Sequence, residues 1–242
     1  MHLPRAFAFL AACFIAASPS LAETVKGNGV LKSEVRAATG FTGVGVSLPA
    51  KVEVRLGAVE SVTVEADENL LPLIETSVRN GSLQIKPVRR NLSIESRAIR
   101  VLVQARQIEQ LDIGGSGSIL AETLRGPRLK LAIGGSGSMD LRGIETDRVD
   151  VSVGGSGDVK LAGTVRRFEA SIAGSGEVEG PGLLADEAQI TIAGSGAAQL
   201  GIRKLLDVTV AGSGAVRYFG DPVVKRTILG SGVIRRMGPL PQ

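Results

Sequence analysis

The sequence predicts an all-β fold, a right-handed parallel β-helix (a β-solenoid) of about seven coils. Gly-Ser-Gly occurs seven times, at steps of 18 to 20 residues, in a chain in which 32 of 242 residues are glycine. Apolar and polar residues alternate on both sides of each motif, as in strands with one buried face. One such unit cannot bury its own apolar face, so successive units must stack as parallel strands, with the usual right-handed crossover.

The Gly-Ser-Gly motifs are expected to form one corner of each coil. Glycine adopts positive φ values that other residues resist, so the chain can bend sharply beside the serine. Each coil is then a strand, a corner, a second strand and a looser turn. Buried positions follow three residues after the serine, as at Ile119, Met139 and Val159. The seven corners are 115–117, 135–137, 155–157, 174–176, 194–196, 212–214 and 230–232.

The strand before each corner carries one outward residue at the same position in every coil. Stacking should align these residues into a flat column of small, mostly hydroxyl-bearing side chains. Such a column could dock an extended polymer, or it could be a plain solvated strand face. The expected column is Asp112, Ala132, Ser152, Ser171, Thr191, Thr209 and Thr227.

Residues 23–110 are less regular and are expected to form an N-terminal cap and early coils, continuous with the regular solenoid of 111–242. Residues 44–54 resemble a degenerate coil with Leu48-Pro49 at its corner, and 61–66 alternate like a strand. Asn80-Gly81 predicts a two-residue hairpin turn. The acidic start of 67–74 suggests a short helix.

The ends of the chain have recognisable features. Residues 1–22 read as a signal peptide, with a positive charge, a short apolar run and a small-residue cleavage site at Ser20-Leu21-Ala22. The minor alternative is a lipoprotein motif with a lipid anchor at Cys13. No later segment is apolar enough for a transmembrane helix. We therefore expect an exported protein, located in the periplasm, at the cell surface or in the medium. Met237–Pro241 should end strand pairing.

Composition excludes several chemistries. The single His and the single Cys, His2 and Cys13, both lie within the predicted signal peptide. The mature chain would then have no Ser-His-Asp triad, cysteine nucleophile, disulfide, or zinc site built on these residues. We expect no cofactor. The formal net charge of +4 is too small to indicate a nucleic-acid partner.

Two segments carry a family resemblance. The runs GFTGVGVSLPAKVEV (40–54) and SVTVEADENLLPLIETSV (61–78), followed by strands punctuated by Gly-Ser-Gly, resemble the auto-transporter adhesin, head GIN domain family. The resemblance implies an exported bacterial β-helical domain with an adhesin-like role. It supplies no catalytic residues.

The turns opposite the corners are rich in cations, which stacking should align into a basic stripe for an anionic polysaccharide or another envelope component. Arg148, Lys225 and Arg226 are expected in the same row. The alternative is that these charges only keep the protein soluble and protect strand edges. The candidate binding residues are Arg125, Arg128, Arg166, Arg167, Arg203 and Lys204.

We therefore expect a non-enzymatic interaction domain that binds a polysaccharide or a protein partner. One alternative is a polysaccharide lyase or glycosidase, which would need clustered carboxylates. Asp158, Glu177 and Glu179 are the candidates, although isolated surface acids explain them as well. The corners could also hold an anion on backbone N–H groups, or the protein could be a structural envelope component without a ligand.

Overall fold

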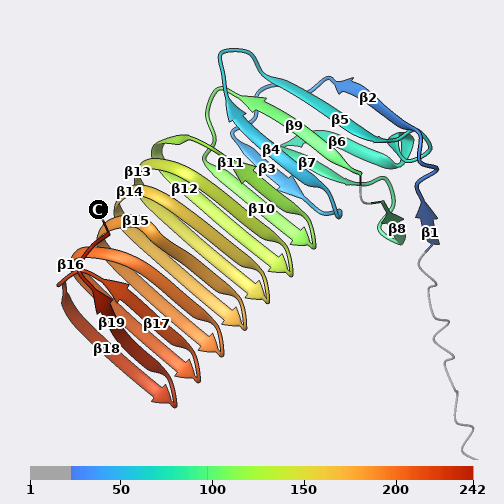
Figure 1. The fold of residues 1–242 in the computed structure, drawn as a ribbon. Helices are drawn as coiled ribbons and strands as arrows, with labels where there is room; N and C mark the ends of the chain where they lie inside the picture. Colours follow the sequence, from blue (N-terminus) through green and yellow to red (C-terminus); the bar gives the residue numbers. More distant parts are fainter. Residues whose placement is uncertain (1–22, 97, 242) are drawn as a thin grey trace, which may run out of the picture.

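The computed structural model describes residues 23–96 and 98–241, and it confirms the predicted β-solenoid. Seventeen strands form one continuous sheet that winds through the coils, while β1 (Glu23–Lys26) and β8 (Leu92–Glu95) form a separate parallel pair. Figure 1 shows the coils as a stepped stack, with the N-terminal strands gathered at one end. The predicted signal peptide and Cys13 lie outside the described residues.

The regular coils pair in parallel with one register from end to end. The first glycine of each corner faces the first glycine of the next, from Gly115 to Gly230. The predicted outward column from Asp112 to Thr227 follows the same register. The strands are β10 (Gln110–Gly115), β11 (Ser118–Ala121), β12 (Leu124–Gly135), β13 (Ser138–Gly155), β14 (Asp158–Gly174), β15 (Glu177–Gly194), β16 (Ala197–Gly212), β17 (Ala215–Phe219), β18 (Val223–Gly230) and β19 (Val233–Gly238).

The turns opposite the corners are more ordered than predicted. β13 to β16 run from one corner through the turn to the next corner, and Arg125 pairs with Glu145 within that turn. Register shifts occur here, for example between Leu141 and Ile144. These irregularities absorb the variation between 18 and 20 residues per coil, so the corners stay aligned.

The two glycines of each corner are required for different reasons. The first adopts a positive φ, +117° at Gly155 and +139° at Gly135, where a side chain would strain the backbone. The second faces the preceding coil: a Cβ on Gly157 would lie 2.5 Å from Ile133 Cγ2. Between them, the Ser156 N–H donates to the Gly135 carbonyl at 2.9 Å. Each corner is therefore built against the one before it.

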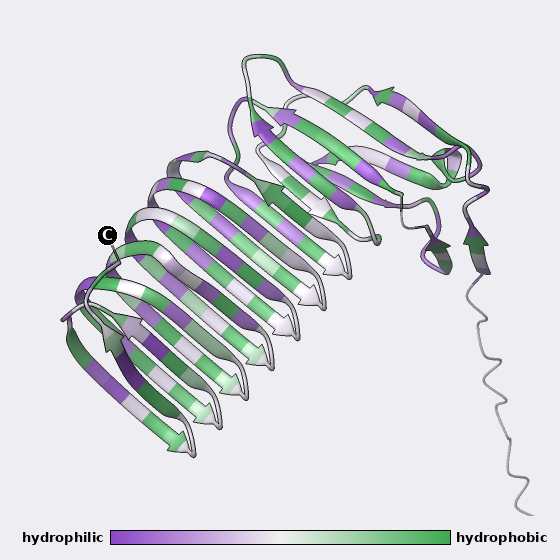
Figure 2. Ribbon diagram, in the orientation of Figure 1, coloured by the Kyte–Doolittle hydropathy of each residue, from purple (hydrophilic) through white to green (hydrophobic). Residues whose placement is uncertain are grey.

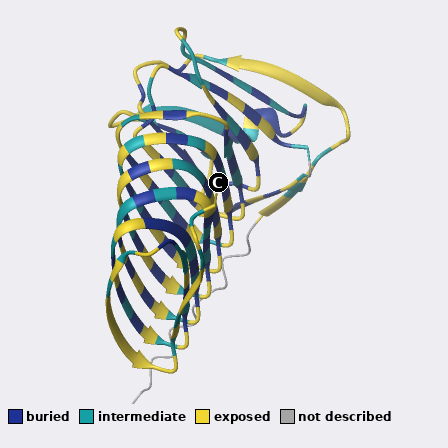
Figure 3. Ribbon diagram, turned by 60° about the vertical axis from the view of Figure 1, so that its left-hand side comes forward, coloured by how far each residue is buried: buried dark blue, intermediate teal, exposed yellow. Residues whose placement is uncertain are grey.

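The core consists of apolar columns between the two main faces of the solenoid. Figure 2 shows the alternation along the strands, and Figure 3 shows buried positions repeating from coil to coil. One column lies at the centre of the strands before the corners, and its members are at most 5% exposed. It comprises Leu111, Leu131, Val151, Ala170, Ile190 and Val208.

The N-terminal region contributes two further coils. Its elements are β2 (Leu31–Arg36), β3 (Gly43–Val46), β4 (Lys51–Leu56), β5 (Ser61–Asp67), η1 (Leu71–Leu73), β6 (Ile74–Arg79), β7 (Ser82–Pro87) and β9 (Arg100–Ala105). β3 and β4 pair in parallel with β10 and β11, which confirms the degenerate coil, and β7 and β9 pair on its far side. β6 and β7 form the predicted hairpin, with positive φ at Asn80 and Gly81.

The helix expected over 67–74 is instead a single 3₁₀ turn, η1. Its acidic start has a different role, because Asp67 ends β5 and is only 5% exposed. The Asp67 carboxylate accepts hydrogen bonds from the Gly29 N–H and the Ser96 hydroxyl, both at 2.7 Å. Asn69 donates to the Lys26 carbonyl at 2.8 Å. These side chains fasten the segment between β1 and β2 to the sheet.

Replacement of Gly157 by alanine should destabilise the solenoid by about 1–3 kcal/mol, because the new methyl group collides with the preceding coil. Urea unfolding measures the change in the free energy of unfolding. Ser156→Ala is the matched control at the exposed position of the same corner, and it should change stability by less than about 0.5 kcal/mol. Equal effects of the two substitutions would contradict this account of the corner.

Asp67→Ala should cost about 1–3 kcal/mol, because it removes the hydrogen bonds that the buried carboxylate accepts from the Gly29 N–H and the Ser96 hydroxyl. Hydrogen exchange should speed up around Gly29 more than in the regular coils. Glu68→Gln is the control, since its exposed ion pair with Lys32 is worth at most about 1 kcal/mol. Unchanged exchange at Gly29 in Asp67→Ala would argue against the fastening role.

Candidate binding surface

The six predicted binding residues lie on the turns opposite the Gly-Ser-Gly corners, on β12, β14 and β16. The structure therefore brings them to one side of the stack, as expected. Each of them forms an ion pair with an acidic residue of a neighbouring coil, so the row is a ladder of alternating charge. The pairs of this charged ladder are Arg125–Glu145 at 2.9 Å, Arg128–Asp150 at 2.6 Å, Arg166–Asp147 at 2.9 Å, Arg167–Glu187 at 3.0 Å, Arg203–Asp186 at 3.3 Å and Lys204–Asp186 at 2.8 Å.

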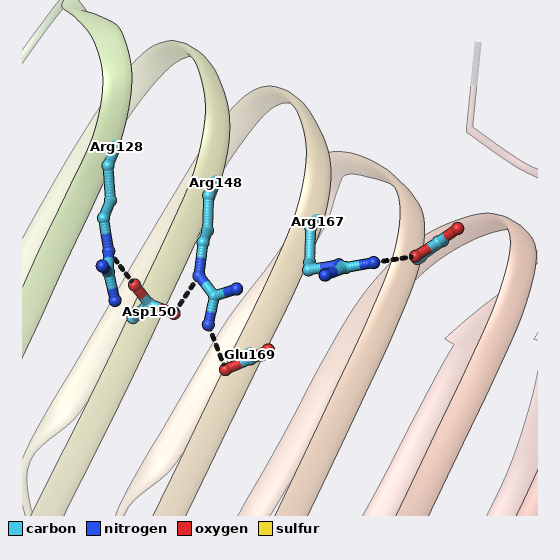
Figure 4. Close-up of polar contacts among 6 residues, drawn as sticks. Arg128, Arg148, Asp150, Arg167 and Glu169 are labelled. Atoms are coloured by element: carbon cyan, nitrogen blue, oxygen red, sulfur yellow. Dashed lines mark hydrogen bonds and ion pairs between the residues drawn. The ribbon is translucent and has the colours of Figure 1, made fainter.

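Part of the ladder is a connected network that crosses three coils (Figure 4). Asp150 accepts hydrogen bonds from the Nε atoms of Arg128 at 2.6 Å and Arg148 at 2.7 Å. Arg148 also donates to Glu169 at 2.5 Å. The hydrogen bond to Asp150 raises the pKa of Arg148 above its ordinary value. Arg128, Arg148 and Arg167 stack in one column, and the acids of the adjacent column offset their mutual repulsion.

Asp186 receives two cations from the following coil. Arg203 and Lys204 fall within a register shift between β15 and β16, where neither residue has a paired partner. Both side chains reach back to the Asp186 carboxylate. The hydrogen bond from Lys204, followed by that from Arg203, lowers the pKa of Asp186. Asp186 is therefore a carboxylate at neutral pH.

The cations of the charged ladder were predicted from the sequence, but their acidic partners were not. Their signal was present, because Arg125 and Glu145 are separated by 20 residues, which is one coil. Arg167 and Glu187 show the same spacing. An acid and a cation one repeat apart meet across adjacent coils, so the repeat length could have revealed the pairs.

A groove of about 410 Å³ runs across four successive coils of the ladder. It presents cations and carboxylates together, and the Arg166 side chain is 75% exposed. The groove can bind an extended ligand through ionic and hydrogen bonds along the solenoid axis. It is lined by Asp147, Arg148, Arg166, Arg167, Asp186, Glu187 and Lys204.

The candidate catalytic carboxylates lie on the main face formed by the strands that follow the corners. Asp158 and Glu177 are neighbours in register at the starts of β14 and β15, and Glu179 lies 3.3 Å from Lys160. Cleavage of a polysaccharide needs a carboxylic acid held protonated near neutral pH beside a second carboxylate. Burial raises the pKa of a different residue, Asp112, which lies on the face formed by the strands before the corners. Within residues 23–96 and 98–241, no three His, Cys, Asp or Glu side chains are grouped to hold a metal ion.

Two backbone donors of each later corner are already used between the coils. The serine N–H of the second and later corners donates to the first-glycine carbonyl of the preceding corner, at 2.9 to 3.0 Å. The residue after each of these corners bonds back in the same way, as Asp158 does to Gly137 at 3.1 Å. These two N–H groups of each corner are therefore not available to an anion, and the anion-binding interpretation stays a prediction.

Comparison with known proteins confirms the resemblance found in the sequence. Residues 40–222 match the family described as putative auto-transporter adhesin, head GIN domain. No protein of curated function matches the chain in sequence. No helix within the described parts of the chain is long and apolar enough to cross a membrane.

Several crystal structures share the fold. A putative adhesin from Bacteroides fragilis has a TM-score of 0.83 at 19% identity, covering 88% of this chain and 100% of its own. A putative lipid binding protein from Parabacteroides distasonis has a TM-score of 0.75 at 24% identity, covering 89% and 100%. A putative adhesin from Parabacteroides merdae has a TM-score of 0.69 at 22% identity, with the same coverage. At these identities, the similarity establishes the fold alone.

Asp112→Asn should raise the melting temperature at pH 7. Burial raises the folded-state pKa of Asp112, against a hydrogen bond from Gln110 and the charge of Lys130 that lower it. The folded carboxyl therefore binds its proton more readily than the unfolded one, whose pKa is about 3.9. Its destabilising effect begins as the pH rises through the unfolded value and is complete above the folded value.

Thermal unfolding from pH 3 to pH 7 tests this effect. The gain from Asp112→Asn should disappear at pH 3, where the carboxyl is protonated in both states. Asp207→Asn, at an exposed outward position on the same face of the solenoid, is the control. A gain that is as large at pH 3 as at pH 7 would exclude the ionisation of Asp112 as its cause.

Proposed function

The chain belongs to the putative auto-transporter adhesin, head GIN domain family, and from this premise we propose that it is an exported, non-enzymatic interaction domain. In this proposal it acts outside the cytoplasmic membrane, in the periplasm, at the cell surface or in the medium. Its partner is an extended acidic polysaccharide of the envelope or the extracellular matrix. The binding surface is the charged ladder, including Arg125, Arg128, Arg166, Arg167, Arg203 and Lys204.

The observation that carries this proposal is the repetition of cations at the same turn in β12, β13, β14 and β16, with Asp186 and Glu187 at that turn in β15. Parallel strands lie about 4.8 Å apart, so the ladder offers charged groups at a regular short spacing along one line. A polymer with a repeating acidic unit can meet several of them at once. A compact ligand would contact only one or two of these charged groups.

The ion pairs of the charged ladder are weak enough for acidic groups of such a polymer to replace the protein's own carboxylates. Exposed ion pairs contribute only about 0–1 kcal/mol each, and Arg166 and Arg125 are 75% and 65% exposed. A polymer carboxylate can therefore replace Asp147 or Glu145 at little cost. Because the protein acids compete with the polymer, each coil contributes weakly, and affinity builds through several simultaneous contacts. Salt should weaken this binding.

A polysaccharide-active enzyme is the alternative. Asp158 and Glu177, which lie side by side on adjacent coils, favour it, because two neighbouring carboxylates are the minimum for glycoside cleavage. The ion pairing of Glu179 with Lys160 leaves the third candidate without a free carboxylate. The adhesin description of the family supports the binding role instead.

Binding of fluorescent alginate, a polyuronate, tests the proposal against neutral dextran at low and physiological salt. Arg166→Glu/Arg167→Glu should weaken alginate binding about tenfold, which corresponds to about 1.4 kcal/mol. Glu145→Gln/Glu187→Gln should strengthen it, because these substitutions free two cations from their protein partners. Arg79→Glu/Arg89→Glu is the matched control, since both arginines are exposed and ion-paired but lie outside the ladder.

Opposite effects of the two ladder variants would support the charged ladder as the binding surface. Equal alginate binding by wild type and both ladder variants would overturn the proposal. Shortening of the alginate chains, abolished by Asp158→Asn/Glu177→Gln, would establish the enzyme alternative instead.

A further inference from the structure

Among the described residues, no coil follows the one formed by β18 and β19. Within that part of the chain, β18 pairs only with β16, and β19 pairs only with β17. Most residues of β18 are exposed, whereas the equivalent strands of the preceding coils alternate between buried and exposed (Figure 3). The described chain therefore ends its stack on an open strand edge of eight residues, Val223–Gly230.

The backbone groups on this open edge can be identified from the hydrogen-bond pattern between the preceding coils. In parallel sheets, each residue directs its N–H and C=O to the same neighbouring strand. The Lys130 N–H donates back to the Glu109 carbonyl at 2.8 Å, so outward-facing residues bond to the preceding coil and inward-facing residues to the following one. In β18 the inward positions are Val224, Arg226 and Ile228. Their N–H and C=O groups face the open side.

The charge of the last coil differs from that of the ladder. Lys225 and Arg226 were expected in a turn, but they lie in the middle of β18, in register with Asp207 and Val208. Arg226 thus occupies the column that is apolar in the preceding regular coils. The expectation was wrong because the final repeats shorten to 18 residues and move these positions into the strand.

β19 adds two further cations, Arg235 and Arg236. Asp221, 3.8 Å from Arg236, is the acidic residue of this coil. Among the described residues of the chain, no ion pair is found for Lys225, Arg226 or Arg235. Lys225 has Asp207 as its register partner, but Arg226 and Arg235 have no acidic one, so the open end carries more uncompensated positive charge than the charged ladder.

Apolar side chains border the same edge. Val223 and Leu229, near the two ends of β18, are 68% and 66% exposed, and Val233 on β19 is 56% exposed. Unpaired backbone groups, free cations and exposed apolar side chains therefore occur together on one terminal coil. An exposed edge of this kind is a template for pairing with another strand.

We propose that β18 is a docking edge for an extended acidic segment of a protein partner, which adds to the sheet as a further strand. The added strand would supply hydrogen-bond partners for the backbone of Val224, Arg226 and Ile228. Its acidic side chains would lie beside Lys225 and Arg226, where opposite charges on neighbouring strands attract. Specificity comes from charge, and affinity comes from main-chain pairing.

Other occupants of this edge satisfy fewer of these groups. An anionic membrane would attract the cations, but lipid cannot pair the backbone N–H and C=O groups of β18. A second copy joined through the same coil would bring Lys225 and Arg226 close to cations of equal charge. The acidic strand is the occupant that satisfies backbone and charge together.

The probe is a fluorescein-labelled octapeptide of Glu and Val with two adjacent Glu residues at its centre, so that one lies beside the outward Lys225 and the next beside the inward Arg226. Comparison peptides replace Glu by Lys, to reverse the charge, or Val by Pro, to prevent strand pairing. Fluorescence polarisation with the purified protein should show binding of the Glu-Val peptide at least tenfold tighter than that of either comparison peptide. Hydrogen exchange should show new protection at the amides of Val224, Arg226 and Ile228 in the complex.

Lys225→Glu/Arg226→Glu should weaken Glu-Val binding at least tenfold. Lys130→Glu is the matched control, because Lys130 lies in the same outward column as Lys225 but between paired strands. Arg166→Glu/Arg167→Glu should leave peptide binding unchanged, so this result is separable from polysaccharide binding by the ladder.

Three outcomes would overturn the proposal. The first is equal binding of the Glu-Val and Glu-Pro peptides, which would indicate charge attraction alone. The second is binding without protection of the β18 amides. The third is absence of peptide binding, and binding to phosphatidylglycerol vesicles in that case would assign the basic end to a membrane surface.

Discussion

The in-register stacking of the Gly-Ser-Gly corners is the constraint on which the rest of the structure depends. The first glycine takes a backbone conformation that side chains resist, while the second leaves room for an apolar side chain of the preceding coil, as Gly157 does for Ile133. The serine between them is held to the preceding corner by its backbone N–H. With one corner fixed on the next, both main faces and the intervening turns must follow the same register.

This register converts a sequence repeat into rows of chemically equivalent positions. The inward rows form the core, and the outward rows form surfaces whose chemistry varies slowly along the axis. In the turns, each cation meets an acid one coil away, as Arg125 meets Glu145. At the last coil, the same stacking leaves half of the β18 backbone groups unpaired. The charged ladder and the basic open edge are thus two consequences of one geometry, with more charge compensation in the ladder than at the edge.

The regular part of the fold could be predicted from the sequence because its information is local and periodic. Alternation identified the strands, the glycines identified the corners, and Asn80-Gly81 identified a hairpin. The spatial order of the early coils could not be predicted, because β3 and β4 lie between a coil formed later in the chain and the first regular one. No local sequence pattern indicates which distant strand becomes a neighbour.

Only the cations of the candidate site could be predicted from the sequence, for the same reason. The cations of the turns were identified from composition, whereas their acidic partners required the coil length to be used as a contact rule. Asp67 was assigned to a helix start because an acid before an apolar run is typical of one. Its burial under the β1–β2 connection depends on contacts between segments about 40 residues apart, which the helix signal does not contain.

The dependence of binding on ligand length tests the central claim most directly, namely that a row of stacked turns is the binding surface. Calorimetry with alginate oligomers of increasing length should show affinity rising until the oligomer spans the ladder. From the turn of Arg125 to that of Lys204 this distance is about 19 Å, at about 4.8 Å per coil. Affinity should level off beyond that length. Equal affinity for the shortest and longest oligomers would contradict the account, because it would place binding at a single compact site.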